Sequence, residues 1–206
     1  MLKKIRDSDA DTVMPYISTT AILLILTAFF LPGIFVMFIQ DMLFYSRDHW
    51  SFLRPSEAYM GFGAAMIWIA VVLLSFLFTK MYAERKDKAY KLAGLHVFMM
   101  AFAPLLFALS IYHYAFLDET GVTGNSFWTF SEEYIAWDDV EEVTRLVDET
   151  NSAVLSYTFS DGEKSITVPY NSREYETRRA ILSAVQMYEW EVTDVFEDAG
   201  TVPITF

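Results

Sequence analysis

Three long stretches in the first half of the chain contain no Asp, Glu, Lys or Arg. These stretches contain 29, 22 and 26 residues, and all of them lie before Asp118. About 20 apolar residues allow a helix to cross the hydrocarbon core of a membrane, because a helix satisfies every backbone polar group internally. The pattern therefore predicts three transmembrane helices, at about residues 16–40, 58–80 and 93–116.

Proline and small residues modify these predicted helices. Pro32 in the first and Pro104 in the third each remove a helix hydrogen bond, which predicts a kink in both. The second helix carries a group of small residues on which a neighbouring helix would pack: Gly61, Gly63, Ala64 and Ala65. That neighbour would come either from the same chain or from a second copy in a homo-oligomer.

After residue 117 the pattern changes to short alternating segments separated by turn residues, which is typical of β-strands. Strands are predicted at residues 126–130, 133–137, 142–147, 152–159 and 164–168. We expect a turn at residues 121–124 and a hairpin turn at Asp161–Gly162. An amphipathic helix is predicted over residues 172–190, with Asn171 as its N-cap and an apolar stripe that covers the sheet.

The chain thus divides into an N-terminal tail (residues 1–15), a three-helix transmembrane region (residues 16–117) and an acidic domain (residues 118–206). The expected fold class is a membrane all-α region joined to a small α+β domain. Residues 118–206 hold 19 acidic and five basic residues, a balance of −14. With −12 for the whole chain, nucleic-acid binding is excluded, because phosphate neutralisation requires a basic face.

Two segments of the acidic domain resemble the bacterial pleckstrin-homology-like domains of small membrane proteins. One is Tyr134-Ile-Ala-Trp-Asp-Asp-Val140, and the other is the hairpin Tyr157-Thr-Phe-Ser-Asp-Gly-Glu-Lys-Ser-Ile-Thr-Val-Pro169. The resemblance covers about residues 113–192 and implies a bent, partly closed antiparallel sheet capped by one C-terminal helix. It also implies a membrane-associated module without catalytic residues.

The resemblance does not extend to phosphoinositide binding. Members that hold these headgroups use basic residues around the first hairpin, whereas the corresponding loop here, residues 118–125, has no Lys or Arg. A domain of this charge is also repelled by anionic lipid surfaces. We therefore expect phosphoinositide headgroups to be disfavoured and the bilayer itself, together with a protein, to be the partners.

No combination of residues indicates catalysis. The chain has no Cys, and its carboxylates match no calcium-loop spacing. His96 and His113 flank the third predicted helix at opposite membrane faces, and His49 lies in the first connection. All three are expected to lie at the membrane interface without a special role. The expectation is a non-enzymatic protein with no catalytic residue, no cofactor and no metal site.

The distribution of Lys and Arg predicts an orientation in the cell membrane. The N-terminal tail and the second connection hold eight basic residues, whereas the first connection holds only Arg47 and Arg54. Because basic flanks favour the cytoplasm, the N-terminus is expected inside and the acidic domain outside.

Three functions follow from these patterns. The leading hypothesis is a membrane-anchored protein-binding, regulatory or accessory protein, such as an immunity-type factor or a complex subunit. Its candidate binding surface combines aromatic and acidic residues: Phe127, Trp128, Trp137, Asp138, Asp139 and Trp190. The alternatives are an oligomeric channel or transporter packed through Gly61 and Ala65, and an interfacial membrane enzyme that uses His49 or His113 with acids of the first connection.

Overall fold

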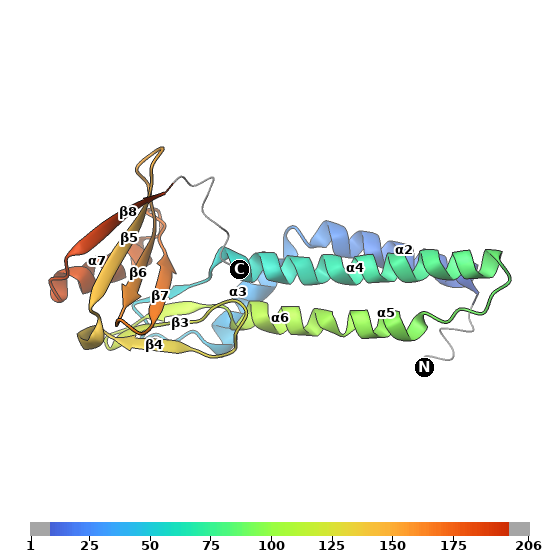
Figure 1. The fold of residues 1–206 in the computed structure, drawn as a ribbon, viewed down its shortest axis with the longest axis horizontal. Coiled ribbons are helices and arrows are strands. Elements are labelled where there is room, and N and C mark those ends of the chain that lie inside the picture. Colours follow the sequence, from blue (N-terminus) through green and yellow to red (C-terminus); the bar gives the residue numbers. More distant parts are fainter. Residues whose placement is uncertain (1–8, 198–206) are drawn as a thin grey trace. The chain divides into compact units, whose positions relative to one another are not determined.

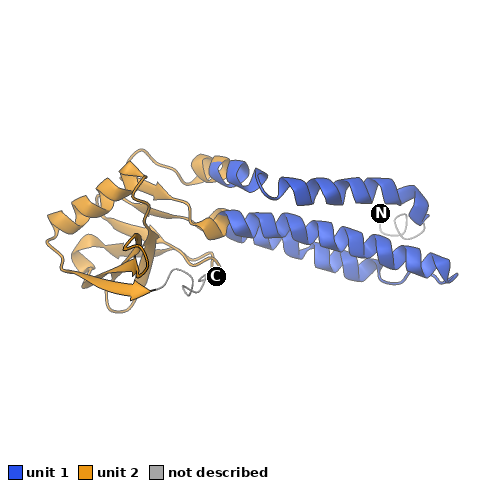
Figure 2. Ribbon diagram, turned by 90° about the horizontal axis from the view of Figure 1, so that it is seen from above, with its two compact units in different colours: residues 1–37, 59–110 blue, residues 38–58, 111–206 orange. Residues whose placement is uncertain are grey.

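The computed structural model describes residues 9–197, and the chain falls into two compact units (Figure 2). Unit 1 comprises residues 1–37 and 59–110, and unit 2 comprises residues 38–58 and 111–206. This division differs from the one expected from the sequence, because unit 2 includes the connection between the first two apolar segments. The basic residues of the N-terminal tail, Lys3, Lys4 and Arg6, lie outside the described residues.

The apolar segments are helical (Figure 1). The helices are α2 (Ala10–Thr27), α3 (Leu31–Leu43), α4 (Ser56–Arg85), α5 (Ala93–Met100) and α6 (Phe102–Tyr112). Within residues 9–197, three helical stretches are long and apolar enough to cross a membrane, namely α2, α4 and the stretch Ala93–Tyr112 that comprises α5 and α6. The third stretch ends at Tyr112 instead of residue 116, because the chain there enters a β-strand.

The regular helix is interrupted shortly before Pro32 and Pro104, and the kinks themselves stay predictions. The first apolar segment breaks after Thr27, and Pro32 is the second residue of α3. The third breaks at Ala101, since α5 ends at Met100, four residues before Pro104. A proline has no N–H for the carbonyl four residues upstream, and its ring crowds that carbonyl. The disturbance therefore appears one turn earlier in the chain.

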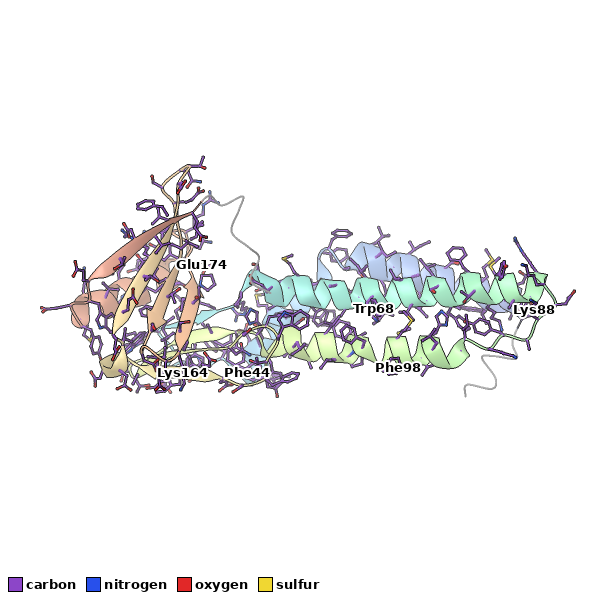
Figure 3. All side chains as sticks on the ribbon, viewed as in Figure 1. Phe44, Trp68, Lys88, Phe98, Lys164 and Glu174 are labelled. Atoms are coloured by element: carbon purple, nitrogen blue, oxygen red, sulfur yellow. The ribbon has the colours of Figure 1, made fainter. Side chains whose placement is uncertain are left out.

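Unit 1 has apolar residues both inside and outside. Trp68 of α4, labelled in Figure 3, donates from Nε1 to the Met99 carbonyl of α5 at 2.8 Å, and the ring of Phe62 lies 4.5 Å from that of Phe107. Large apolar side chains also point outward: Phe29 is 81% exposed and Phe98 is 77% exposed. Exposed apolar faces of this extent are typical of helices that meet lipid.

Unit 2 contains two four-stranded sheets. The first has the order β1-β2-β3-β4 and is antiparallel throughout; its strands are β1 (Ser51–Leu53), β2 (Ala115–Leu117), β3 (Gly121–Gly124) and β4 (Glu133–Ala136). The second has the order β7-β6-β5-β8, with strands β5 (Glu142–Asp148), β6 (Val154–Ser160), β7 (Ser165–Pro169) and β8 (Val192–Glu197). Only the β5–β8 pair is parallel.

Strand β1 comes from the connection between α3 and α4. Phe52 of β1 pairs with Phe116 of β2, and the backbone N–H of Trp50 donates to the Leu117 carbonyl at 2.7 Å. The indole of Trp50 also stacks on that of Trp137, with 6.3 Å between ring centroids. A segment far from the acidic domain in sequence therefore completes its first sheet.

Helix α7 (Tyr175–Met187) covers the core of unit 2. Its Ala180, Ile181 and Ala184 belong to one buried cluster with inward-facing residues of both sheets, including Ile135 of β4 and Phe159 of β6. Burial of one large apolar side chain contributes about 1.5–3 kcal/mol, so this stripe is a principal source of stability for the unit. The α+β class expected from the sequence is thus present.

Several predicted elements differ from those in the structure. Residues 121–124 form β3 instead of a turn, because the Asp118 carboxylate accepts from the N–H groups of Thr120 and Gly121 and so places the turn earlier. A Cβ at Gly121 would collide with the Ile135 carbonyl, which explains a glycine in a strand. Residues 126–130 form no strand. The Asp161–Gly162 turn is confirmed, with φ of +84° at Gly162.

The end of the domain also differs. The residue before α7 is Glu174, and Asn171 instead accepts from the Arg173 N–H at 3.1 Å, which closes a local turn. The helix is shorter than predicted, and strand β8 follows it. Val192 lies beside Val143 of β5, so the parallel pairing that creates β8 is a long-range contact that local patterns do not report.

Candidate binding surfaces

A cleft of about 700 Å³ lies in unit 2 between the α3–α4 connection and α7. It is lined by aromatic, basic and hydroxyl side chains: Tyr45, Arg47, His49, Trp50, Ser51, Phe52, Arg54, Tyr175, Glu176, Arg179, Ala180, Ser183 and Met187. We call it the arginine cleft, after Arg47, Arg54 and Arg179. Its wall is held by β1, whose Ser51 hydroxyl lies 2.9 Å from that of Thr177 in α7. The cleft has the size of an ordinary small-molecule site.

The three arginines of this cleft have different surroundings. Arg54 forms an ion pair with Asp41, and its guanidinium lies 4.8 Å from the centroid of the Phe52 ring. Its Nε–H is buried and has no hydrogen-bond partner among the described residues. Arg47 and Arg179 are exposed, and neither has an ion-pair partner within residues 9–197. Donors for an anion are thus available on both walls.

His49 lines the same cleft in its neutral form. Its ring stacks on that of Phe116 with 4.1 Å between centroids, and Nδ1 accepts from the Ser46 N–H at 3.3 Å. Burial lowers the pKa of the imidazole, and the carboxylates of Asp118 and Asp48 offset part of that shift. Because Nδ1 is the acceptor, Nε2 carries the proton and is a further donor.

His113 lines a second cleft of unit 2, of about 570 Å³, that does not include His49. The His113 side chain is buried, meets the Phe127 ring edge-on at 5.6 Å, and has no partner for Nδ1 among the described residues. Burial lowers its pKa, partly offset by Asn125 and Glu57. The structure therefore places His49 and His113 in two different clefts, and the interfacial-enzyme hypothesis, which uses one or the other, stays untested. Within residues 9–197, no three His, Asp or Glu side chains are grouped closely enough to hold a metal ion.

The predicted aromatic and acidic surface is divided between the interior and the exterior of unit 2. Trp137 is 1% exposed and Phe127 is 6% exposed, and Trp190 packs on the core beside Trp137 with 5.8 Å between ring centroids. Asp138 and Asp139 are exposed on the short 3-10 helix Trp137–Asp139. The prediction that Trp137 and Phe127 face a partner is therefore wrong, because a small two-sheet domain uses its large aromatic residues as core.

Trp128 belongs to an exposed aromatic loop instead. Trp128 is 54% exposed, and Phe130, two residues further, meets the ring of Tyr112 edge-on at 5.5 Å. Tyr112 is the last residue of α6, and its carbonyl accepts from the Asn125 side-chain amide. We call residues 126–131 the aromatic loop; it lies beside the end of a helix that is apolar enough to cross a membrane.

The small residues of α4 differ in environment. A Cβ at Gly63 would lie 3.0 Å from the Ala28 carbonyl oxygen, and Ala65 is fully buried. Gly61 is partly buried, whereas Ala64 is exposed. Gly63 therefore packs against the break between α2 and α3 of the same chain.

A buried polar cluster in unit 1 was not expected from the sequence. His96 lies 3.2 Å from the Ser75 hydroxyl through Nε2 and 3.0 Å from the Tyr90 hydroxyl through Nδ1, and Tyr90 in turn lies 3.0 Å from Thr79. Lys80, only 1% exposed, lies 3.5 Å from the Glu84 carboxylate. These contacts join α4 to the start of α5, so His96 has a structural role.

The arginine cleft itself was missed at the level of sequence. Arg47 and Arg54 entered only the count of flanking charges, and Arg179 entered none of the site predictions. One local signal exists: Arg178 and Arg179 are adjacent basic residues in an otherwise acidic segment. Nothing in the sequence indicates that they lie opposite a connection more than 120 residues earlier.

Comparisons with protein-family models, with curated proteins and with solved structures found no significant match to this chain.

Proposed function

We propose that this protein is a membrane-anchored binding protein, without enzymatic activity, whose unit 2 binds a protein partner and regulates or supports it. The observation that carries the proposal is the edge of the second sheet. Among the described residues, β8 pairs on one side only, and its Phe196 is 57% exposed. A free strand edge with apolar side chains binds extended segments of other proteins by strand addition.

Exposed apolar residues on the two last described elements support the same proposal. Helix α7 exposes Leu182 and Met187, and β8 also exposes Val195. Single exposed apolar residues are ordinary, but several on two consecutive elements are typical of an interaction surface. Ala65, one of the two residues of the proposed oligomer face, is fully buried within the chain, which favours a binding protein over an oligomeric channel.

Membrane anchoring rests on α2, α4 and the stretch Ala93–Tyr112, which we propose to be the three crossings. The aromatic loop, with Trp128 and Phe130, would then lie in the headgroup layer, where amphipathic rings are favoured. In membrane fractionation we expect the chain in the pellet after carbonate washing and in solution only with detergent. Recovery as a water-soluble particle would contradict the proposal.

The orientation and the domain family are parts of this proposal. The charge distribution favours a cytoplasmic N-terminus and unit 2 on the outer side, which protease or tag accessibility in intact cells would test. The pleckstrin-homology-like assignment is supported by two sheets followed by a helix, whereas β8 after that helix is an addition to the expected pattern.

The binding proposal is tested by photo-crosslinking in native membranes. A photoreactive residue at position 196 is expected to capture one protein in stoichiometric amounts. The matched control is position 163, because Glu163 is an exposed residue of the hairpin turn in the same unit. Equal labelling from both positions, or no captured protein from position 196, would reject partner binding at this edge.

A further inference from the structure

The lining of the arginine cleft is basic, although the unit that contains it is acidic overall. Unit 2 holds seven basic and 22 acidic residues, a balance of −15. Three of the seven basic residues line this one cleft, and Glu176 is the only acid in its lining. At about 0.1 M salt, carboxylates more than roughly 10 Å away hardly repel an anion in the cleft, because the salt screens them. The residues that line the cleft therefore decide the charge of the ligand.

Among the described residues, two of the three arginines of the cleft have no ion pair, and several carboxylates lie nearby. Asp41 pairs with Arg54, Glu176 belongs to the lining, and Asp48 and Asp118 lie close enough to His49 to act on its pKa. Arg47 and Arg179 have no ion-pair partner within residues 9–197, and the Arg54 Nε–H is buried without an acceptor. A guanidinium is the preferred group for oxyanions, because its planar donors match two oxygens at once. The unpaired guanidiniums therefore fit an oxyanion, and the carboxylates around the cleft favour one with a single negative charge over one with two.

The aromatic lining of the cleft and its position near the start of α4 further restrict the class of ligand. Tyr45, Trp50 and Tyr175 provide aromatic surface around the arginines. Arg54 lies two residues before the start of α4, so chain length alone keeps it within about 8 Å of that helix end. A phosphodiester carries one negative charge and is the group that every common phospholipid presents beside such a helix end.

We propose that the arginine cleft binds a singly charged phosphodiester, held by Arg47 and Arg179, with the Arg54 Nε–H and the His49 Nε2–H as further donors. The source of this group is either the headgroup of a membrane phospholipid or a soluble phosphodiester. This inference goes beyond the proposed function and does not depend on a protein partner.

The test uses the full chain, extracted in mild detergent from membranes that contain phosphatidylglycerol and phosphatidylethanolamine. Native mass spectrometry counts the phospholipids retained by the wild type, by Arg47→Gln/Arg179→Gln and by Lys164→Gln/Arg173→Gln. The last variant is the control: it also removes two positive charges from unit 2, but from residues outside the cleft. Unit 1 is identical in all three proteins. We expect the cleft variant to retain at least tenfold less phospholipid than the control.

A second arm identifies the source. Delipidated protein is titrated with glycerophosphoglycerol, the deacylated headgroup, and with inorganic phosphate. Lipid retention that the deacylated headgroup displaces supports the membrane source. Headgroup binding without lipid retention supports the soluble source. Binding of inorganic phosphate alone would overturn the phosphodiester assignment.

The site is rejected if the cleft variant and the charge-matched control behave alike in both arms. Near-ultraviolet circular dichroism establishes that the variants are folded. If the glutamine variant does not fold, Arg47→Lys/Arg179→Lys replaces it: lysine keeps the charge but loses the two-point geometry, so a severalfold weaker headgroup affinity is expected. An unchanged affinity in a folded lysine variant would then overturn the proposal.

Discussion

His49 and His113 each contact an aromatic ring of unit 2, and burial is the main influence on both side chains. The pKa of each imidazole is lowered, so both are neutral near pH 7. In the unfolded chain the same groups bind protons at about pH 6.5. The unfolded state therefore takes up more protons than the folded state as the pH falls below that value.

Unit 2 is accordingly expected to lose stability as the pH falls from about 7.5 to 5. Each histidine contributes stability that is complete above its unfolded pKa and is lost as the pH falls through the folded pKa. The midpoint of chemical denaturation of the detergent-solubilised chain, measured across this range, tests the expectation. His49→Phe/His113→Phe should flatten the profile. A profile of the wild type that is already flat would contradict it.

Gly63 and Gly33 form a matched pair in unit 1. A Cβ at position 63 would press on the Ala28 carbonyl oxygen at 3.0 Å, whereas a Cβ at position 33 would meet nothing within 4 Å. Gly63→Leu should therefore destabilise the helices by about 1–3 kcal/mol through overpacking. Gly33→Leu should be neutral or stabilising, because it replaces a glycine with a better helix former. Unfolding by added SDS, followed by helicity, measures both.

At the scale of the element, β8 is held to its sheet by a parallel pair and by one side-chain bridge. Arg145 of β5 donates to both oxygens of the Asp194 carboxylate, at 2.7 Å each. This contact raises the pKa of Arg145 and lowers that of Asp194. Strand β8 is otherwise largely exposed, so its edge position depends on backbone pairing with β5.

Arg145→Ala is therefore expected to release β8 while the remaining strands stay folded. Hydrogen exchange of residues 192–197 should become at least severalfold faster, and exchange in β6 should not change. Thr158→Ala provides the control, because it removes a comparable cross-strand contact with Thr167 between β6 and β7. If Thr158→Ala accelerates exchange in β8 as much as Arg145→Ala does, the bridge has no specific role.

At the scale of the whole molecule, unit 2 is assembled from two segments separated in the sequence. Residues 38–58 supply β1, the Trp50 indole that stacks on Trp137, and one wall of the arginine cleft. The Gln40 amide, fully buried, also donates to the carbonyls of Ile111 and His113. The acidic C-terminal half of the chain is thus an incomplete folding unit.

A fragment of residues 111–197 is expected to aggregate or to remain partly unfolded. Without β1 the edge of β2 is unpaired and the Trp137 face is uncovered, and exposed edges promote association. Appending residues 44–55 through a flexible linker should restore solubility and a dispersed NMR spectrum. A fragment that is monomeric and fully folded without this addition would show that β1 is dispensable.

Local sequence patterns predicted a large part of this fold. Charge-free stretches identified the helices because a membrane-length apolar run has few other stable states. The Asp161–Gly162 hairpin and strands β4 to β7 followed from turn chemistry and alternation. The N-cap at Asn171 failed because Asn side chains also close local turns, and this one does so.

The sequence by itself determined that the chain has three apolar helical segments and an acidic α+β unit, since hydropathy and charge are properties of neighbouring residues. Only the tertiary structure decided which aromatic residues are core, that β1 and β8 complete the sheets, and that Arg47, Arg54 and Arg179 meet in one cleft. These features depend on contacts between residues that are 49 positions apart in the β5–β8 pair and 132 apart for Arg47 and Arg179. Such contacts form where apolar side chains become buried and strand backbones become paired in the folded chain. Both depend on residues that are distant in sequence, so a local pattern cannot predict them.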